Sequence, residues 1–398
     1  MKEYKYVIIG GGMTGSAAVI GIRKNDPSGS IALFSEEKYS PYNRPPLTKG
    51  LWNDTVINDI VRPMDKYDVD LFLENSIKSL GPEKNLAITE DGETYAYEKL
   101  LLATGGHPIH LPDTPEGVIY YRTRADYHKL RELIKEKQDF CVIGGGFIGS
   151  EITAALAKND KNVTMIFPEI GISGRILPDD LSEYINQYYE NKGVRVLAGN
   201  LVQAMKKENG KYLVRYKKVN TGDEMETTFD VVIVGVGIKP NVVLAQDAGI
   251  TVENGIVVNE FLQTDYPNIF AAGDVANFFN PALKERTRVE HEDNANTMGL
   301  AAGQNMSGEA QPYDHFPFFY SDLFDLGYEA VGEMNKDYDI YEDWVEPFKK
   351  GAIFYLDQGR IKGLIFWNLW DKVDQGREII AKDEPHSKLD LKGLFIGE

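Results

Sequence analysis

The sequence predicts an α/β protein in which one strand–turn–helix unit occurs twice and a C-terminal α+β domain follows. Three observations predict this class. Residues 6–19 (YVIIGGGMTGSAAV) and 141–154 (CVIGGGFIGSEITA) share the order of an apolar run, a glycine-rich turn and a helical pattern. Further apolar strands alternate with helical stretches, which is typical of parallel, doubly wound sheets. Residues 313–370 hold 16 aromatic side chains in 58 positions, which indicates a separate sheet-rich domain.

Composition excludes several classes of protein. The 398 residues suffice for two or three domains with a large core. With 43 Lys and Arg against 61 Asp and Glu, the net charge is −18, so nucleic acid is not expected as a partner. The single cysteine, Cys141, cannot form an internal disulfide or a thiolate cluster, and no metal site is predicted. The sequence contains no run of 18 apolar residues, so no membrane helix is expected.

The N-terminus allows two interpretations. Lys2 and Lys5 precede the apolar, small-residue stretch from Val7 to Ile22, which resembles a signal peptide. The alternative is that this stretch is the first strand and helix of the repeated unit. The glycine spacing favours the second interpretation, and we therefore expect a cytoplasmic protein.

Each copy of the repeat carries Gly-x-Gly-x-x-Gly between a strand and a helix. In a Rossmann-like unit the first glycine allows the tight turn, the second leaves room for a pyrophosphate, and the third lets the helix pack on the strand. The pyrophosphate then lies at the positive end of the helix. These positions are Gly10, Gly12 and Gly15 in the first copy, and Gly144, Gly146 and Gly149 in the second.

A second apolar strand in each copy ends in an acid, Glu36 or Glu169. The acids follow the last glycine by 21 and 20 residues, close to the spacing at which a carboxylate binds the ribose of a dinucleotide. An acid there repels a 2′-phosphate, so Glu169 favours NADH over NADPH, although Arg175 weakens this preference. One glycine motif arises easily by chance. Two copies, each with strand, helix and acid, argue for two dinucleotide sites.

Other elements follow from local patterns. A turn is expected at Asp357–Gly359 between two strands within residues 351–370, and residues 383–398 read as a tail or short helix. Strands are also expected within residues 98–106, 229–237 and 264–274, and a helix at 181–193.

Two dinucleotide sites on one chain imply FAD and NADH. The arrangement resembles the FAD-dependent pyridine nucleotide oxidoreductases, whose fold is glutathione-reductase-like. Within that superfamily the sequence is most similar to apoptosis-inducing factor and its prokaryotic relatives, with ferredoxin and rubredoxin reductases as near neighbours. The resemblance to the superfamily depends on the segments RPPLTK, LLLATGG, GVGIKPN and AAGD. The resemblance to the narrower group depends on YNRPPLTKGLW, GGGFIGSE, IFPEIGISGRILP, RVEHEDNA, FFYSDLFDLGYEAVGE and KKGAIFYLDQGRIKGLIFWNLW.

The sequence departs from the animal members of this group. We do not expect a mitochondrial targeting segment, and only residues 329–350 stand where those members have a long insertion. Tyr320 occupies the tryptophan position of a Trp-Ser-Asp motif, and Glu292 replaces the second histidine of an RVEHH run. The negative net charge does not support DNA association. The redox chemistry is therefore expected here, and the cell-death role is not.

The repeat predicts a division into three domains, because the second copy interrupts the first unit and the chain returns to that unit at GVGIKPN. FAD would be bound by residues 1–112 and 239–312, and NAD(H) by residues 113–238. Residues 313–398 would form a sheet-rich C-terminal domain of the kind used in dimerisation or other interfaces.

Four residues are implied to take part in catalysis. Lys49 and Glu151 would form an ion pair beside the flavin, where a cation stabilises negative charge on the reduced ring. The alternative is a surface lysine and a glutamate that favours a helix start. Phe147 would cover the flavin face that nicotinamide approaches, or it packs in the core. His291 would approach the flavin or nicotinamide edge, or it is an ordinary polar residue.

Further residues are implied to contact FAD. Arg44, beside Pro45, can grip a pyrophosphate with two hydrogen bonds, or it is a solvated loop residue. Asp274 would bind a ribityl hydroxyl. Tyr320 or Phe319 would stack near the isoalloxazine ring. Thr104 and Gly105 of LLLATGG would flank the flavin.

The function expected from these features is FAD-dependent oxidation of NADH. No cysteine lies near residues 40–50, where related disulfide reductases place a reactive thiol, so electrons would leave the flavin directly. The external acceptor stays open between a small redox protein, a quinone and oxygen. The alternative is an NADH-responsive redox sensor with low turnover that acts through dimerisation or partner binding. A homodimer is also left open.

Overall fold

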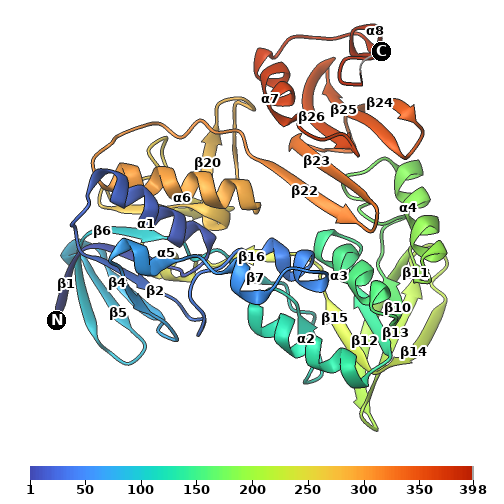
Figure 1. The fold of residues 1–398 in the computed structure, drawn as a ribbon, viewed down its shortest axis with the longest axis horizontal. Coiled ribbons are helices and arrows are strands. Elements are labelled where there is room, and N and C mark those ends of the chain that lie inside the picture. Colours follow the sequence, from blue (N-terminus) through green and yellow to red (C-terminus); the bar gives the residue numbers. More distant parts are fainter. Residues whose placement is uncertain (397–398) are drawn as a thin grey trace. The chain divides into compact units, whose positions relative to one another are not determined.

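The computed structural model describes residues 1–396 and divides into two compact units, each assembled from segments far apart in the sequence (Figure 1). The first unit contains residues 1–45, 56–107 and 239–319. The second contains residues 46–55 and 108–238 together with the chain from Tyr320 onward. Short strands β7 (Gly106–Pro108) and β16 (Ile238–Pro240) lie where the chain passes from one unit to the other.

The first unit is built on a seven-stranded sheet in the order β3-β2-β1-β6-β5-β4, with β19 also paired to β6. The strands next to β1 run parallel to it, whereas β5 and β4 are antiparallel. β6 accommodates two partners on one side because residues 94–96 pair with β5 and residues 100–102 with β19. The bounds are β1 Lys2–Ile9, β2 Ile31–Phe34, β3 Asp70–Phe72, β4 Ile77–Gly81, β5 Leu86–Thr89, β6 Thr94–Leu102 and β19 Ile269–Ala271.

Helices α1 (Met13–Asn25) and α6 (Glu292–Met306) of this unit pack at very short range. A Cβ atom at Gly299 would lie 2.4 Å from the Thr14 carbonyl oxygen, and one at Gly303 would lie 2.1 Å from that of Ala18. Small residues on α6 are therefore needed for the helices to meet. The unit also contains α5 (Val243–Asp247), a second sheet of β17 (Val252–Glu253), β18 (Gly255–Val257), β20 (Ala276–Asn280) and β21 (Glu285–Thr287), and 3₁₀ helices at Ile57–Ile60, Met64–Tyr67, Pro82–Lys84 and Gly273–Val275.

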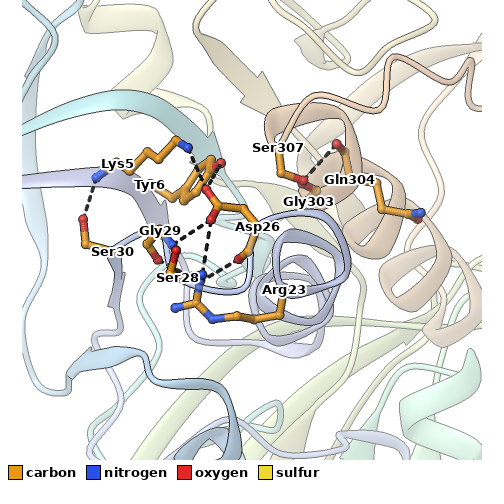
Figure 2. A network of polar contacts seen from close by, with 10 residues as sticks. All are labelled: Lys5, Tyr6, Arg23, Asp26, Ser28, Gly29, Ser30, Gly303, Gln304 and Ser307. Atoms are coloured by element: carbon orange, nitrogen blue, oxygen red, sulfur yellow. Dashed lines mark hydrogen bonds and ion pairs between the residues drawn. The ribbon is translucent and has the colours of Figure 1, made fainter.

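A polar network joins the end of α1 to the start of β2 (Figure 2). Asp26 accepts hydrogen bonds from the Lys5 ammonium at 2.7 Å, the Tyr6 hydroxyl at 2.9 Å and the Gly29 amide at 2.8 Å. The Lys5 hydrogen bond is the main cause that holds the pKa of Asp26 well below its usual value. Arg23 donates to the carbonyls of Asp26 and Gly29 at 3.0 and 2.7 Å. Together these contacts fix the turn that leads into the sheet.

The second unit contains a parallel sheet in the order β11-β10-β9-β15-β8. Helix α3 packs against β9 and β10 of this sheet. An antiparallel sheet, β12-β13-β14, shares a hydrophobic core with β9 and β15. The bounds are β8 Ile119–Tyr120, β9 Asp139–Ile143, β10 Asn162–Ile166, β11 Arg195–Leu197, β12 Asn200–Glu208, β13 Lys211–Lys218, β14 Glu224–Phe229, β15 Val231–Val234, α2 Arg124–Glu136, α3 Phe147–Lys158 and α4 Asp179–Asn191.

The C-terminal part of the second unit is a five-stranded antiparallel sheet, β22-β23-β26-β25-β24. One face is covered by the chain end, where Phe395 packs on Phe354 and Phe366 with ring centroids 5.7 and 4.9 Å apart. On the other side, the Tyr355 hydroxyl donates to the Ile176 carbonyl. The bounds are β22 Phe318–Leu323, β23 Leu326–Gly332, β24 Asp339–Glu346, β25 Lys350–Asp357, β26 Arg360–Trp367, α7 Val373–Lys382 and α8 Lys388–Leu391.

The expected elements are confirmed. β15 and β19 lie within two of the apolar segments, β6 overlaps the segment 98–106 but begins earlier, and α4 overlaps the expected helix with both ends two residues earlier. The turn between β25 and β26 is formed by Gln358 and Gly359, both at positive φ, and α8 is the expected short C-terminal helix. The predicted α/β class with two Rossmann-like sheets and a C-terminal α+β part is confirmed, while the division into three domains stays a prediction. Within residues 1–396, no helix combines the length and apolarity required to cross a bilayer.

Candidate functional site

In the first glycine loop, two of the three glycines have no room for a side chain and the remaining one does. Gly10 has φ +121°, and a Cβ atom there would lie 2.1 Å from the Ala103 carbonyl oxygen. A Cβ at Gly15 would lie 2.0 Å from the Gly10 carbonyl oxygen. At Gly12, Nη2 of Arg44, at 4.0 Å, is the only atom of residues 1–396 within 4 Å of such a Cβ. The space above the start of α1 therefore fits a pyrophosphate, with a guanidinium group beside it.

The second glycine loop repeats this geometry. Gly144 has φ +115°, and a Cβ atom there would lie 2.3 Å from the Gly235 carbonyl oxygen. A Cβ at Gly149 would lie 2.0 Å from the Gly144 carbonyl oxygen, whereas one at Gly146 would meet nothing within 4 Å. The same three roles are thus filled at both copies of the motif. The residues present fit one dinucleotide in each unit.

Arg44 is held beside the first loop by its own neighbours. It forms an ion pair with Glu37 at 2.7 Å and lies over the ring of Tyr42, 5.4 Å from its centroid. Burial lowers its pKa, but Tyr42, Glu37 and Asp274 raise it, with a net increase. A permanent cation beside Gly12 suits a pyrophosphate, as the resemblance implies.

Asp274 and His291 belong to the same unit and are close enough to interact electrostatically. Gly273, which precedes Asp274, has φ +77°, and a Cβ atom there would lie 2.2 Å from Oγ1 of Thr14 on α1. His291 is the residue before α6, and its ring stacks on Phe319 with centroids 4.3 Å apart. Burial lowers the pKa of His291 to about 4, although the carboxylates of Asp274 and Asp293 oppose this shift. His291 is therefore neutral at pH 7.

The remaining candidates of the first unit are Thr104, Gly105 and Glu36. Oγ1 of Thr104 donates to the Asn241 carbonyl at 2.7 Å, and Nδ2 of Asn241 donates back to the Thr104 carbonyl at 2.7 Å. Gly105 has φ +63°, which favours glycine at this bend. Glu36 is exposed just beyond the end of β2, while the neighbouring Glu37 is the acid that binds Arg44.

In the second unit, Glu169 follows β10 and pairs with Arg175 at 2.6 Å. The Arg175 side chain is 74% exposed and the Glu169 side chain 20% exposed. An acid of the type that suits ribose hydroxyls and a cation of the type that suits a 2′-phosphate are thus in contact. The preference for NADH over NADPH stays a prediction.

Glu151 is the most enclosed acid among the candidates. It lies in the second turn of α3 and is 4% exposed. Its Oε2 accepts from the Lys49 ammonium at 2.7 Å and from the Thr48 hydroxyl at 2.6 Å, and its Oε1 accepts from the Ser321 hydroxyl at 2.7 Å. The Lys49–Glu151 ion pair is thus formed. Thr48 and Ser321 were missed by sequence reasoning, although each adjoins a named candidate, Lys49 or Tyr320.

The segment that carries Lys49 is anchored within the second unit. The Leu47 carbonyl accepts hydrogen bonds from Nε1 of Trp52 at 2.7 Å and from the Tyr121 hydroxyl at 2.5 Å. The Arg131 guanidinium on α2 covers the Trp52 ring at 5.2 Å. The backbone on either side of Lys49 is therefore fixed, and its ammonium lies 5.1 Å from the ring centroid of Tyr320.

Phe147 and Cys141 complete the second unit. Phe147 is the first residue of α3 and is partly exposed, so it is not a fully buried core residue; its role as a gate stays a prediction. Cys141 lies in the middle of β9 with no exposed surface, and burial raises the pKa of its thiol. A thiol in this state is a poor nucleophile.

The structure thus gathers the candidates into two groups. The first unit holds a glycine loop with Arg44, Thr104, Gly105, Asp274 and His291, and the second holds a glycine loop with Lys49, Phe147, Glu151, Glu169 and Tyr320. An α/β protein with two such loops belongs to the class that binds two dinucleotides. The roles of the individual residues remain predictions.

Comparisons with known proteins identify the family. The model described as pyridine nucleotide-disulphide oxidoreductase matches residues 4–299. Apoptosis-inducing factor 1, mitochondrial, of Dictyostelium discoideum is 35% identical over 96% of this chain and 79% of its own length. The 3-phenylpropionate/cinnamic acid dioxygenase ferredoxin--NAD(+) reductase component of Photorhabdus laumondii is 31% identical over 95% of each chain.

Solved structures agree with this result. A ferredoxin reductase from Rhodopseudomonas palustris superposes with a TM-score of 0.88 at 28% identity, covering 97% of this chain and 96% of its own. The chain belongs to the pyridine nucleotide-disulphide oxidoreductase family, and the resemblance to apoptosis-inducing factor and ferredoxin reductases is confirmed. It is an FAD-dependent NADH oxidoreductase.

Proposed function

We propose that this protein takes electrons from NADH and delivers them, through FAD, to a small redox protein without using a cysteine. The observation that carries the proposal is the state of Cys141, which is the sole cysteine and is fully buried in β9. Family members named for disulphide chemistry need an accessible thiol, and this chain has none. Electrons must therefore leave the flavin itself.

The names of similar proteins support a protein acceptor. Two relatives are a ferredoxin--NAD(+) reductase component and a ferredoxin reductase subunit. The covalent putidaredoxin reductase–putidaredoxin complex superposes with a TM-score of 0.87 at 27% identity, covering 97% of this chain and 94% of its own. The net charge of −18 would slow encounter with an acidic carrier, so the carrier would dock where the local charge is positive.

The proposed roles of the residues follow from their surroundings. Gly12 and Gly146 admit the two pyrophosphates. Lys49, fixed by Glu151, would place positive charge beside the isoalloxazine ring. Phe147 would cover the ring face until nicotinamide displaces it, and Glu169 would hold the ribose of NADH. When bound, FAD supplies the acceptor for the hydride from nicotinamide C4 and can pass electrons on singly.

An anaerobic stopped-flow experiment tests this function. We expect NADH to bleach the flavin absorbance in a single fast phase before any acceptor is added. In a second mixing step, a ferredoxin or rubredoxin should restore the absorbance faster than a quinone or oxygen. Fast reoxidation by a quinone or oxygen alone would reject the protein acceptor. Slow turnover with a long-lived complex and a change in oligomer size would instead favour the redox sensor.

Replacement of Cys141 by alanine tests the thiol-free route. We expect Cys141→Ala to keep the rate of electron transfer from NADH to the carrier within about twofold, because the buried thiol takes no part in it. The melting temperature should fall slightly, since removing one buried sulfur costs about 1 kcal/mol. A loss of carrier reduction with normal flavin bleaching would show that the thiol is required.

A further inference from the structure

The carboxylate of Glu151 accepts from three donors, which come from two separate segments of the second unit. Thr48 and Lys49 come from the segment 46–55 and share Oε2. Ser321 comes from β22 and takes Oε1. The Glu151 side chain is 3% exposed, so water does not compete for these positions. Two neutral hydroxyls therefore decide how the carboxylate is turned toward Lys49.

We propose that Ser321 and Thr48 are positioning residues that orient Glu151 and thereby fix the Lys49 ammonium for the redox reaction. The inference rests on the proposed role of Lys49 beside the flavin. It assigns to the C-terminal sheet, through Ser321 and then Glu151 and Lys49, an indirect part in setting the flavin potential.

Geometry explains why both hydroxyls are needed. A carboxylate can rotate about its Cγ–Cδ bond, and the Lys49 contact alone leaves that rotation open. The Ser321 hydroxyl on Oε1 and the Thr48 hydroxyl on Oε2 pin the two oxygens separately, at 2.7 and 2.6 Å. Hydrogen bonds to a charged group are the strong ones, so this orientation is well defined.

The neighbour of Ser321 supports the same conclusion. Tyr320 precedes Ser321 on β22, and its ring centroid lies 5.1 Å from the Lys49 ammonium. The Tyr320 ring of β22 therefore contacts the Lys49 ammonium directly. The next residue, Ser321, acts on Lys49 through its hydrogen bond to Glu151. Two consecutive residues of one strand define the position of the cation.

The direction of the effect follows from charge sharing. The carboxylate divides its negative charge among three donors. If one hydroxyl is removed, Glu151 draws more strongly on Lys49, and the ammonium contributes less to stabilising negative charge on the flavin ring. The reduction potential of the flavin should therefore become more negative, and reduction of the flavin by NADH should slow.

The test compares four variants with two matched controls. Ser321→Ala and Thr48→Val remove the hydroxyls, and Ser321→Thr and Thr48→Ser keep them. The controls remove a hydroxyl that is buried in the same unit and has no hydrogen-bond partner within residues 1–396: Ser182→Ala on α4 and Thr153→Val on α3. Thr153 lies two residues from Glu151, so it also controls for disturbance of the helix.

We expect Ser321→Ala and Thr48→Val each to lower the equilibrium constant for flavin reduction about tenfold, which is about 30 mV for a two-electron couple. The rate of reduction by NADH should fall at least fivefold, while the dissociation constant of NAD⁺ stays within twofold. Ser321→Thr and Thr48→Ser should restore the potential. Both controls should keep the potential of the unmodified protein.

The variant Lys49→Met distinguishes the proposed role of Lys49 from the positioning role of the two hydroxyls. If Lys49→Met moves the potential and neither hydroxyl variant does, the positioning role is overturned and the proposed role of Lys49 stands. If Lys49→Met leaves the potential unchanged, the role of Lys49 itself fails. Should Ser321→Ala not retain FAD, Ser321→Cys keeps the volume with a weak donor. An unchanged potential in that variant also overturns the proposal.

Discussion

Replacing Gly146 by valine is expected to abolish reduction by NADH while leaving the protein folded and FAD bound. A Cβ atom at this position would meet nothing within 4 Å among residues 1–396, and the backbone, at φ −83° and ψ −167°, is one that any residue adopts. We therefore expect the substitution to leave the fold of the polypeptide intact. It fills the space that the pyrophosphate of NADH needs above the start of α3, so NAD(H) affinity should fall at least a hundredfold.

Titration of the oxidised protein with NAD⁺ and anaerobic mixing with NADH measure this effect. Gly12→Val is the corresponding change in the first unit and should instead yield protein without FAD. Gly81→Val is the control, because Gly81 has an ordinary φ of −117° and a Cβ there would make only normal contact with Leu86. Gly146→Val with unchanged NAD⁺ affinity would mean that the second loop does not bind the coenzyme.

The glycine loops could be predicted from sequence because each role is local. Gly10 and Gly144 are bent to positive φ and closed against a neighbouring strand, and the third glycine of each loop touches the carbonyl of the first. All of these constraints lie within a few residues of one another or at the next strand. A short motif therefore encodes the turn, the packing and the open space together.

The surroundings of Glu151 could not be predicted in the same way. Its three partners lie 103, 102 and 170 residues away along the chain, at Thr48, Lys49 and Ser321. No periodic pattern relates these positions. The Lys49 pair was accessible only through resemblance to a known family. Thr48 and Ser321 lie within the quoted RPPLTK and Trp-Ser-Asp segments, but nothing in those segments relates either hydroxyl to Glu151.

Two turns of the C-terminal sheet could also not be predicted from the local sequence. Phe324 and Phe348 lie in hairpin turns at φ +61° and +60°, where glycine is the usual residue. Each ring packs on a tyrosine of α4, with centroids 4.8 Å apart for Phe324 and Tyr189 and 5.1 Å for Phe348 and Tyr184. Long-range ring contacts thus override the local backbone preference, and composition alone indicated only an aromatic-rich domain.

Replacing Arg23 by methionine is expected to destabilise the first unit by about 3 kcal/mol. Besides the two carbonyls of the turn after α1 (Figure 2), Arg23 donates to the carbonyls of Tyr67 and Asp68, each at 2.7 Å. One side chain thus ties α1 to the turn before β2 and to the residues before β3. Methionine keeps most of the apolar stem but leaves four carbonyls without this donor, and water can replace only the most exposed of them.

A thermal melt should show this as a melting temperature lower by about 10 °C, since 1 kcal/mol corresponds to roughly 2–4 °C in a unit of this size. FAD should be released at the same transition, because the predicted FAD-binding glycine loop leads into α1, and Arg23 lies in the last turn of that helix. Arg215→Met is the control. The Arg215 side chain is 55% exposed, and its ion pair is with Glu226, whose side chain is 54% exposed. Surface pairs of that kind contribute little. Equal melting temperatures for the two variants would show that the Arg23 contacts do not hold the edge of the sheet together.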